Sequence, residues 1–376
     1  MPFACVRRWE AELRQGGALP APVDAIARLG AGVMRLGMFL RRMRRPQRVA
    51  ARVVSIGNIT AGGTGKTPLV IERVLREMAA GRTVAVLTRG YGARRRGETA
   101  PGLVVVRTDA ERPPGGEWLG DEPELIARRA PGVIIARGAD RVAGARAAIE
   151  RFGADLLILD DGYQYLRLTR DENIVVLDAA NPFGNGRVLP RGVLREPLSA
   201  LRRAAAVVLT RCDQATGFDA IEEALARFCP DAPVRYTRHA PSRLWSLRDG
   251  SELPLDALRG ARIGAACAIG RPEAFRATLA ALGAEPTWFR AYPDHAVIPV
   301  DDLPPAELTL VTEKDAMRVV DPPEGFYALG VDLEDMPRPA AAGSSTDRAA
   351  SPANAAEDQR PEVDGPAEQD DHGARG

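Results

Sequence analysis

The chain contains 376 residues, 45% of them hydrophobic, and carries a formal net charge of +1. This length and apolar content predict a globular protein of about two domains and exclude an intrinsically disordered chain. The balanced charge gives no overall reason to expect a nucleic acid partner, and the four scattered cysteines, which form no C-x-x-C pair, argue against zinc and disulfide frameworks.

The N-terminal region predicts an extension over residues 1–24 and then a basic amphipathic segment over residues 25–48, helical at 25–45. Large apolar side chains recur there at alternating spacings of three and four, which places them on one helical face: Ile26, Leu29, Val33, Leu36, Leu40 and Met43. The longest uncharged run is six residues, far too short to cross a bilayer. Two interpretations stay open, because this face suits either a membrane interface or the surface of the chain's own domain.

Residues 49–210 predict a nucleotide-binding core. Short apolar runs of strand length alternate with helical stretches and lie at 52–56, 83–88, 133–136, 155–159, 174–178 and 205–210. This rhythm predicts an α/β fold with a mostly parallel sheet and helices on both faces, as in P-loop NTPases. Since no secretory signal pattern opens the chain, we expect a reducing cytoplasmic compartment.

The strongest motif is the glycine-rich segment from Ser55 to Thr67, which follows an apolar run and precedes a helical pattern. This context is typical of a phosphate loop, because glycines let backbone N–H groups approach phosphate oxygens. In such a loop Lys66 reaches the β- and γ-phosphates and the Thr67 hydroxyl binds Mg²⁺. The expected nucleotide contacts are Thr60, Ala61, Gly62, Gly63, Thr64, Gly65, Lys66 and Thr67. Thr60 replaces the usual first glycine, which alters the first turn of the loop and leaves the phosphate cradle intact.

The run from Leu156 to Gly162 is an apolar strand that ends in Asp160 and Asp161. Strand-end carboxylates downstream of a P-loop are typical of a Walker B element, which places an acid beside Mg²⁺. Strand-end aspartates also cap turns in many proteins. Only the P-loop upstream favours the metal-binding interpretation here.

Residues 211–336 predict a smaller α/β lobe, with strands at 262–268, 308–312 and 326–331 and a helix at 272–282. The composition of residues 337–376 predicts a disordered tail. The run from Thr210 to Asp213 is loosely similar to the base-reading [NT]-K-x-D motif of GTPases, with Arg211 in place of the lysine.

Three more motifs are weak by themselves. Asp121, Glu122 and Glu124 are typical of acids that stabilise a helix N-terminus. Asp294 and His295 form an isolated acid and imidazole pair, and the run RGVLRE at 191–196 is typical of a solvated loop.

In this order, the segments resemble the tetraacyldisaccharide 4'-kinase family, the lipid A kinases of Gram-negative bacteria. The resemblance covers roughly residues 25–335 and rests on eight segments: GNITAGGTGKTP at 57–68, TRGYG at 88–92, GDEP at 120–123, DDGYQ at 160–164, FGNGR at 183–187, RGVLRE at 191–196, PDH at 293–295 and TEKDA at 312–316. One such match is weak evidence, whereas eight in the family's order are specific.

The resemblance implies Mg²⁺-dependent transfer of the γ-phosphoryl group of ATP to the 4'-hydroxyl of a tetraacylated glucosamine disaccharide phosphate, on the cytoplasmic face of the inner membrane. It implies that Asp121, paired with His295, accepts the proton of the attacking hydroxyl, as an acid oriented by an imidazole does in general base catalysis. The other roles that it implies are Mg²⁺ and nucleotide binding by Asp160 and Asp161, lining of the site by Arg195 and Glu196, and positions near the lipid headgroup for Tyr91 and Arg141.

Two features depart from the family pattern. Tyr165 stands where the family usually has histidine, and tyrosine carries no imidazolium charge near neutral pH. The N-terminal segment is richer in arginine than is common in the family, which suggests attachment to the membrane surface.

Two competing functions remain. A P-loop GTPase or ATPase that acts as a metallochaperone or assembly factor agrees with the P-loop and the Asp160–Asp161 pair, but it should carry clustered cysteine or histidine ligands. A nucleotide-binding scaffold at the membrane surface has no acceptor, and the matches at Asp121 and His295 are then accidental. No obligate protein partner is indicated.

Overall fold

The computed structural model describes residues 21–42, 45–90, 102–109 and 119–338, all of which belong to one compact unit. Most of the predicted tail and of the predicted N-terminal extension lies outside the described residues, as does Tyr91. The predicted domain boundary between residues 210 and 211 stays a prediction.

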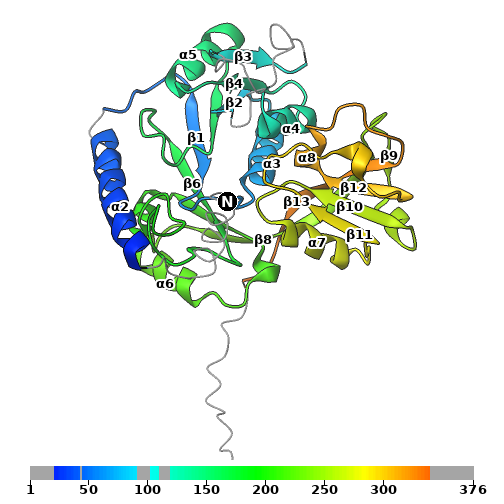
Figure 1. Cartoon of the computed structure of the whole chain (residues 1–376). Coiled ribbons are helices and arrows are strands. Elements are labelled where there is room, and N and C mark those ends of the chain that lie inside the picture. The colour runs from blue at the N-terminus through cyan, green and yellow to red at the C-terminus, as the bar shows by residue number, and fades with distance from the viewer. Residues whose placement is uncertain (1–20, 43–44, 91–101, 110–118, 339–376) are drawn as a thin grey trace, which may run out of the picture. The chain divides into compact units, whose positions relative to one another are not determined.

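The strands of the described residues form one sheet in the order β11-β10-β12-β13-β8-β7-β6-β1-β5-β2-β4-β3, with β9 beside β8 (Figure 1). Their bounds are β1 Arg52–Gly57, β2 Val84–Thr88, β3 Val104–Arg107, β4 Ile134–Arg137, β5 Leu156–Asp160, β6 Glu172–Asp178, β7 Ala206–Thr210, β8 Val234–Ser246, β9 Glu252–Leu253, β10 Ile263–Cys267, β11 Trp288–Ala291, β12 Leu308–Thr312 and β13 Phe326–Asp335. The α-helices are α2 Ala21–Arg42, α3 Lys66–Ala79, α4 Asp121–Arg129, α5 Arg141–Phe152, α6 Asp219–Phe228, α7 Pro272–Ala281 and α8 Glu313–Ala316.

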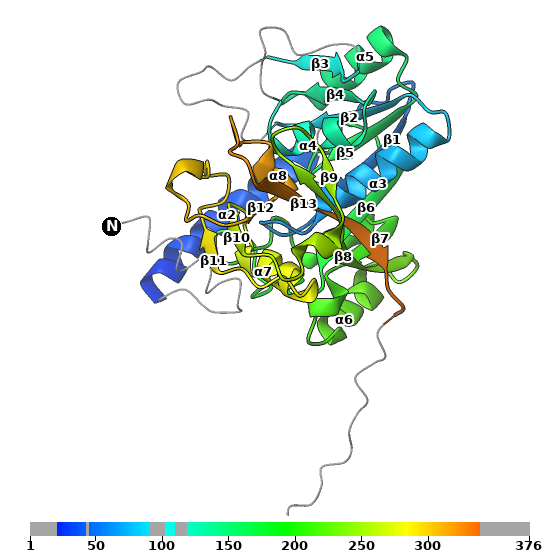
Figure 2. The ribbon, with the colours of Figure 1, turned by 90° about the vertical axis from the view of Figure 1, so that its right-hand side faces the viewer.

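The central strands are apolar along their whole length because helices cover both faces of the sheet. Alternate residues of β1 and β5 point to opposite faces, where α3 and α4 form one layer and α5 and α6 form the other (Figure 2). The pairings of β1, β2, β4, β5, β6 and β7 with one another are parallel. The predicted mostly parallel α/β fold is confirmed, and so are its predicted strands, with ends that differ by a few residues.

Four strands were not predicted: β3, β8, β9 and β11. The longest, β8, has basic residues at Arg235, Arg238, His239 and Arg243 and contains Pro241, which cannot donate a hydrogen bond to a neighbouring strand. Pro241 lies opposite Val331, where the register of the β8 and β13 pair shifts. A central strand with a proline and four basic residues has the sequence pattern of a loop.

Strand β8 connects the two halves of the sheet. It pairs in parallel with β7 and, further along, in antiparallel fashion with β13. Backbone hydrogen bonds therefore continue from residues 49–210, the predicted nucleotide-binding core, into residues 211–336, the predicted C-terminal lobe. Strand β8 therefore links the positions of the side chains that lie at the ends of β6, β7 and β8.

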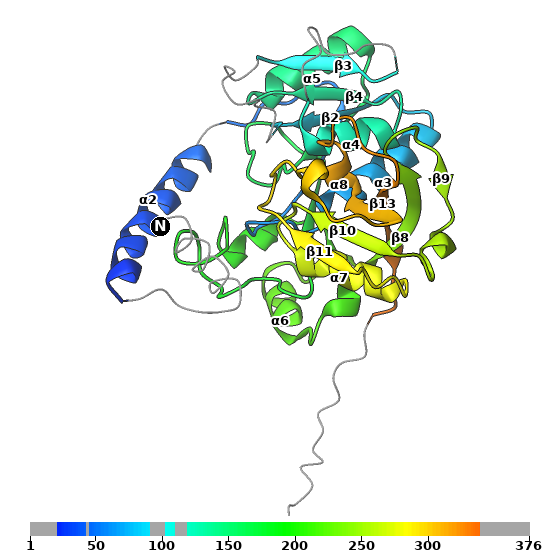
Figure 3. The same cartoon turned by 45° about the vertical axis from the view of Figure 1, so that its right-hand side comes forward.

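Helix α2 confirms the predicted N-terminal helix, and it contacts the protein through Ala27, Ala31 and the partly buried Met38. Ala27 and Ala31 are buried, whereas Ile26, Leu29 and Val33 are 75%, 74% and 66% exposed. These three side chains are thus turned away from the described part of the chain, unlike the arrangement expected of a face that packs on its own domain. Figures 1 and 3 show α2 outside the layers that enclose the sheet.

A buried carboxylate fastens α2 to the loop between β6 and β7. Asp24 accepts hydrogen bonds from Arg191 at 2.8 and 3.1 Å and from Arg28 on its own helix at 3.0 Å. A Cβ on Gly30 would lie 3.2 Å from Pro190, so the helix approaches this loop closely. The RGVLRE loop, predicted to be solvated, is therefore a docking surface for α2. No helix of the described residues is both long and apolar enough to cross a bilayer.

Candidate active site

The P-loop joins β1 to α3 and is held by the side chains of Asn58, which follows β1, and of Thr210 and Arg211 at the end of β7. Asn58 Nδ2 donates a hydrogen bond to Thr64 Oγ1 at 3.1 Å, and Thr210 Oγ1 donates to the Thr64 carbonyl at 2.8 Å. Arg211 Nη1 donates to the Gly63 carbonyl at 3.2 Å. Because these carbonyls are bonded on the outer side, backbone N–H groups are left to face a phosphate.

Thr60, which replaces the first glycine of the motif, is buried and belongs to a bridge with Leu194. The backbone N–H of Ala61 donates to the Val193 carbonyl at 2.7 Å, and the N–H of Arg195 donates to the Ile59 carbonyl at 2.7 Å. The first turn of the P-loop is therefore paired with the RGVLRE segment and needs no glycine at residue 60.

Gly65 precedes α3 and has a left-handed backbone with φ of 77°. The imidazole of His239 on β8 packs against it, so that a Cβ on Gly65 would lie 2.5 Å from His239 Nε2. Burial, assisted by Arg211 and Arg271, lowers the pKa of His239 to about 3. The ring is thus neutral near pH 7 and acts as a packing group behind the loop.

Asp178, at the end of β6, connects the P-loop to the C-terminal lobe. It pairs with Arg211 at 2.6 Å and also with Arg271, the residue that precedes α7. The TRCD run thus supports the backbone of the P-loop, because Arg211 contacts both Asp178 and Gly63. Sequence reasoning missed Asp178 and Arg271, since neither lies in a recognisable motif.

The two aspartates that end β5 have different surroundings. Asp160 is 2% exposed, and burial, followed by the nearby charges of Glu122 and Asp161, raises its pKa to about 7. Burial also opposes ionisation of Asp161, but Lys66 and Arg195 outweigh it and lower the pKa of Asp161. Lys66 Nζ lies 3.5 Å from Asp161 Oδ1, and Arg195 Nη1 lies 2.7 Å from Asp161 Oδ2. Asp161 therefore holds two cations beside the P-loop.

The structure brings Asp121 and His295 together across the two lobes, although 173 residues separate them in the chain. His295 Nδ1 lies 2.7 Å from Asp121 Oδ2, and Arg318 Nη1 lies 3.6 Å from the same oxygen. The Asp121 side chain is 3% exposed and that of His295 is 40% exposed. His295 is therefore the member of the pair that reaches the solvent, and Arg318 is a third partner that no sequence pattern indicated.

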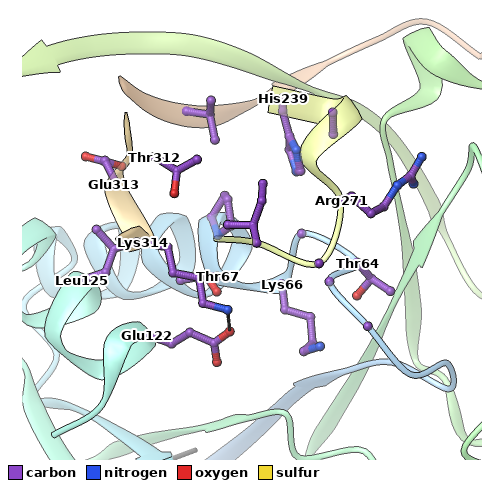
Figure 4. A pocket seen from close by; sticks show the side chains of 18 of the residues that line it. Thr64, Lys66, Thr67, Glu122, Leu125, His239, Arg271, Thr312, Glu313 and Lys314 are labelled. Atoms are coloured by element: carbon purple, nitrogen blue, oxygen red, sulfur yellow. Dashed lines mark ion pairs between the residues drawn. The ribbon is translucent and has the colours of Figure 1, made fainter. Parts of the chain in front are cut away.

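A cavity of about 570 Å³ joins these groups, a volume in the range of small-molecule sites. Its wall includes the P-loop from Gly62 to Thr67, both strand-end aspartates, Arg195 and His295. The C-terminal lobe contributes Arg271 and Lys314, and Figure 4 shows Lys314 beside Glu122, whose Oε1 lies 3.4 Å from the Lys314 Nζ. Glu122 and Lys314 were not predicted as site residues.

Several predicted site residues do not belong to this wall, within the described residues. Thr60 and Ala61 pair with the RGVLRE segment instead. Glu196 is buried and pairs with Arg203 at 2.7 Å, and Asp121 lies behind His295. Arg141 begins α5, and its guanidinium lies 4.9 Å from the centre of the Tyr165 ring.

Tyr165, the departure from the family pattern, has a local structural function. Its hydroxyl accepts a hydrogen bond from the Arg141 backbone N–H at 3.1 Å and donates one to Asp140 at 3.2 Å. Asp140 in turn caps α5 by accepting from the N–H groups of Val142 and Ala143. Tyr165 therefore stabilises the helix start that presents Arg141.

Comparisons with known proteins agree over most of the chain. The family model for tetraacyldisaccharide-1-P 4'-kinase matches residues 18–342. A tetraacyldisaccharide 4'-kinase from Anaeromyxobacter sp. (strain Fw109-5) is 46% identical over 282 residues, which cover 72% of this chain and 74% of the relative. One from Geobacter sulfurreducens is 42% identical and covers 74% of both chains. A crystal structure of LpxK from Aquifex aeolicus in complex with ATP is 28% identical, covers 84% of this chain and 95% of that chain, and has a TM-score of 0.66.

We predict that Gly65→Ala destabilises the fold in the absence of nucleotide. A side chain in the left-handed conformation costs about 1–2 kcal/mol, and the collision with His239 adds about 1–3 kcal/mol. Denaturant unfolding measures the change, with Gly63→Ala as the control, because a Cβ on Gly63 meets no described atom within 4 Å. Adding His239→Ala to Gly65→Ala should recover the collision energy only. Equal stability of Gly65→Ala and Gly63→Ala would contradict this packing.

Proposed function

Because the chain belongs to the tetraacyldisaccharide-1-P 4'-kinase family, we propose that it transfers the γ-phosphoryl group of ATP to the 4'-hydroxyl of a tetraacylated glucosamine disaccharide 1-phosphate, a step of lipid A biosynthesis that forms lipid IVA. One observation carries this function: the P-loop and His295, whose imidazole pairs with Asp121, open into one cavity. A phosphoryl donor and a hydroxyl acceptor need these two groups to face each other. A metallochaperone needs neither an acceptor site nor such a pair.

Donor binding is assigned to the P-loop. Its N–H groups and the N-terminus of α3 attract the triphosphate, and Lys66 neutralises charge that spreads over the transferred group. Asp161 holds Lys66 and Arg195 near the phosphates before ATP arrives. The charged side chains of the site therefore need little reorganisation at the moment of transfer. Charge that is positioned in advance accelerates phosphoryl transfer in this way.

The strand-end aspartates fit a Mg²⁺ ion. Asp160 Oδ1 is buried and has no hydrogen-bond partner in the described part of the chain, and carboxylate and hydroxyl oxygens are the ligands that Mg²⁺ prefers. Thr67, Asp160 and Asp161 would hold it. When bound, Mg²⁺ would neutralise charge on the β- and γ-phosphates.

The dyad is assigned to the acceptor. Asp121 lies 3.6 Å from Arg318 and orients the imidazole of His295, and the pair takes the proton of the attacking 4'-hydroxyl. Because His295 is the more exposed member of the pair, its imidazole receives that proton. Asp121 stabilises the imidazolium that forms. The two side chains then act as one base.

The acyl chains of the substrate require contact with a membrane, and α2 is the element suited to it. Ile26, Leu29 and Val33 form an exposed apolar row on a helix whose sequence is rich in arginine. Such a face inserts at the headgroup boundary of an anionic bilayer. We therefore assign the protein to the cytoplasmic face of the inner membrane as a peripheral enzyme.

The kinase assignment predicts that the purified chain phosphorylates a tetraacyldisaccharide 1-phosphate from labelled ATP in detergent micelles. Lys66→Ala should lower the rate by about a hundredfold or more with ATP saturating, since its charge is needed in the transition state. Arg76→Ala is a matched control, because Arg76 lies on the same helix and its side chain is 60% exposed. No labelled lipid from the wild-type chain, or normal turnover by Lys66→Ala, would overturn the assignment.

If Asp121 and His295 act as one base, their substitutions should not be additive. Asp121→Ala and His295→Ala should each slow turnover strongly, and the double variant should be about as slow as the slower single one. The measurement is a double-mutant cycle on kcat, with the unfolding temperature recorded for each variant. Losses that multiply would indicate two independent roles.

For the membrane, replacing Ile26, Leu29 and Val33 together by serine should weaken binding to anionic vesicles by about tenfold or more, because burial of one such side chain contributes about 1.5–3 kcal/mol. The apparent KM for lipid should rise, and the KM for ATP should remain unchanged. Val320→Ser is the control, since Val320 is also exposed. A variant that still binds vesicles but unfolds at a lower temperature would show that this face is covered by protein.

A further inference from the structure

Lysine is almost absent from this chain, and both of its lysines line the same cavity. Of 51 basic residues that are lysine or arginine, only Lys66 and Lys314 are lysines. Both belong to the cavity wall, one from the P-loop and the other from the TEKDA segment of the C-terminal lobe. Arginine occupies the other basic positions, including the solvated ones. A compact, rotatable ammonium therefore occurs at two places on the cavity wall, where it differs in size and geometry from the guanidinium groups of Arg195 and Arg271 on the same wall.

The neighbours of Lys314 hold its backbone in place. Glu313 pairs with Arg129 at 2.9 Å, and both side chains are less than 10% exposed. Asp315 accepts hydrogen bonds from the Ala268 backbone N–H at 3.1 Å and from Thr312 Oγ1 at 2.6 Å, and it also pairs with Arg318. The acidic residues on either side of Lys314 are thus locked into buried contacts, which leaves Lys314 to point into the cavity (Figure 4).

The ammonium of Lys314 has a weak partner in this state. Its Nζ lies 3.4 Å from Glu122 Oε1, a carboxylate that is 34% exposed, whereas Lys314 itself is 23% exposed. Glu122 also adjoins Asp121 at the start of α4. A pair at this distance and exposure contributes little to stability and is easily exchanged for a better anion.

Resting on the kinase function proposed above, we propose that Lys314 is a phosphate-binding residue that the C-terminal lobe contributes to the site, and that it exchanges Glu122 for the transferred phosphoryl group. Two phosphates are available, the γ-phosphate of ATP and the 1-phosphate of the acceptor. The γ-phosphate is favoured, because Lys314 and Lys66 face the same cavity, and the 1-phosphate lies on the other sugar from the hydroxyl that reacts. Lys66 and Lys314 thus approach one phosphoryl group from the two lobes.

The scarcity of lysine permits a direct test on the unaltered protein. Amines are labelled by reductive methylation, and the rates at Lys66 and Lys314 are followed by mass spectrometry with Mg²⁺ and the β,γ-methylene analogue of ATP, with Mg²⁺ and ADP, or with the lipid acceptor alone. The analogue should protect both lysines, whereas ADP should protect Lys66 and leave Lys314 labelled at its original rate. Protection of Lys314 by the acceptor alone would retain phosphate binding and assign it to the 1-phosphate.

Substitutions give the second measurement. Lys314→Ala should weaken binding of the ATP analogue by about tenfold and binding of ADP by less than about twofold, because a charge-assisted hydrogen bond to the γ-phosphate is lost. Glu122→Gln is the control: if Lys314 served only to pair with Glu122, both variants would change analogue binding equally. We expect Glu122→Gln to leave analogue binding unchanged or tighter.

The outcomes separate the two hypotheses. Protection of Lys66 with no protection of Lys314 by analogue or acceptor, together with unchanged affinity of Lys314→Ala, would overturn the role of Lys314 and leave the kinase function standing. Failure of the analogue to protect either lysine would overturn both.

Discussion

Charge that leaves water must find a partner, and this constraint organises the cavity. A polyphosphate site needs cations, yet the protein must be folded before any phosphate arrives. The chain meets both needs by giving its cavity cations carboxylate partners: Lys66 and Arg195 share Asp161, and Lys314 pairs with Glu122. The same rule applies to the buried acid Asp121, which lies between His295 and Arg318.

Because the partners come from different elements, the pairing also determines how the lobes meet. Arg129 on α4 and Glu313 on α8 form an almost fully buried pair, and Arg271 of the C-terminal lobe reaches Asp178 at the end of β6. Removing one member of such a buried pair typically costs about 3–5 kcal/mol, since the other charge is left without compensation. Strand β8 adds a continuous backbone link between the same two regions. Charges that serve the site thus also hold its two walls in register.

The sequence predicts what depends on short segments. The strands around the P-loop, the P-loop itself and the strand-end aspartates follow from local apolar runs and glycine spacing. Strand β8 was missed because its basic residues and Pro241 resemble a loop, and its strand state comes from pairing with β7 and β13. Lys314 and Arg318 were missed for a related reason: only the tertiary fold brings α8 next to α4. The contact of Asp121 with His295 came from family resemblance, because no local pattern connects residues so far apart.

Helix α2 illustrates how one amphipathic segment can satisfy two surfaces. Gly30 and Asp24 contact the loop after β6, and Ala27 and Ala31 are buried, since small side chains permit close approach and a buried carboxylate needs the Arg191 guanidinium. Ile26, Leu29 and Val33 are consequently left on the exposed side. The loop that receives Asp24 continues to Arg195, whose guanidinium contacts Asp161 beside the P-loop lysine. The helix with the exposed apolar row and the cations of the cavity are therefore attached to the same short loop, at residues 191 and 195, so the position of one constrains the position of the other.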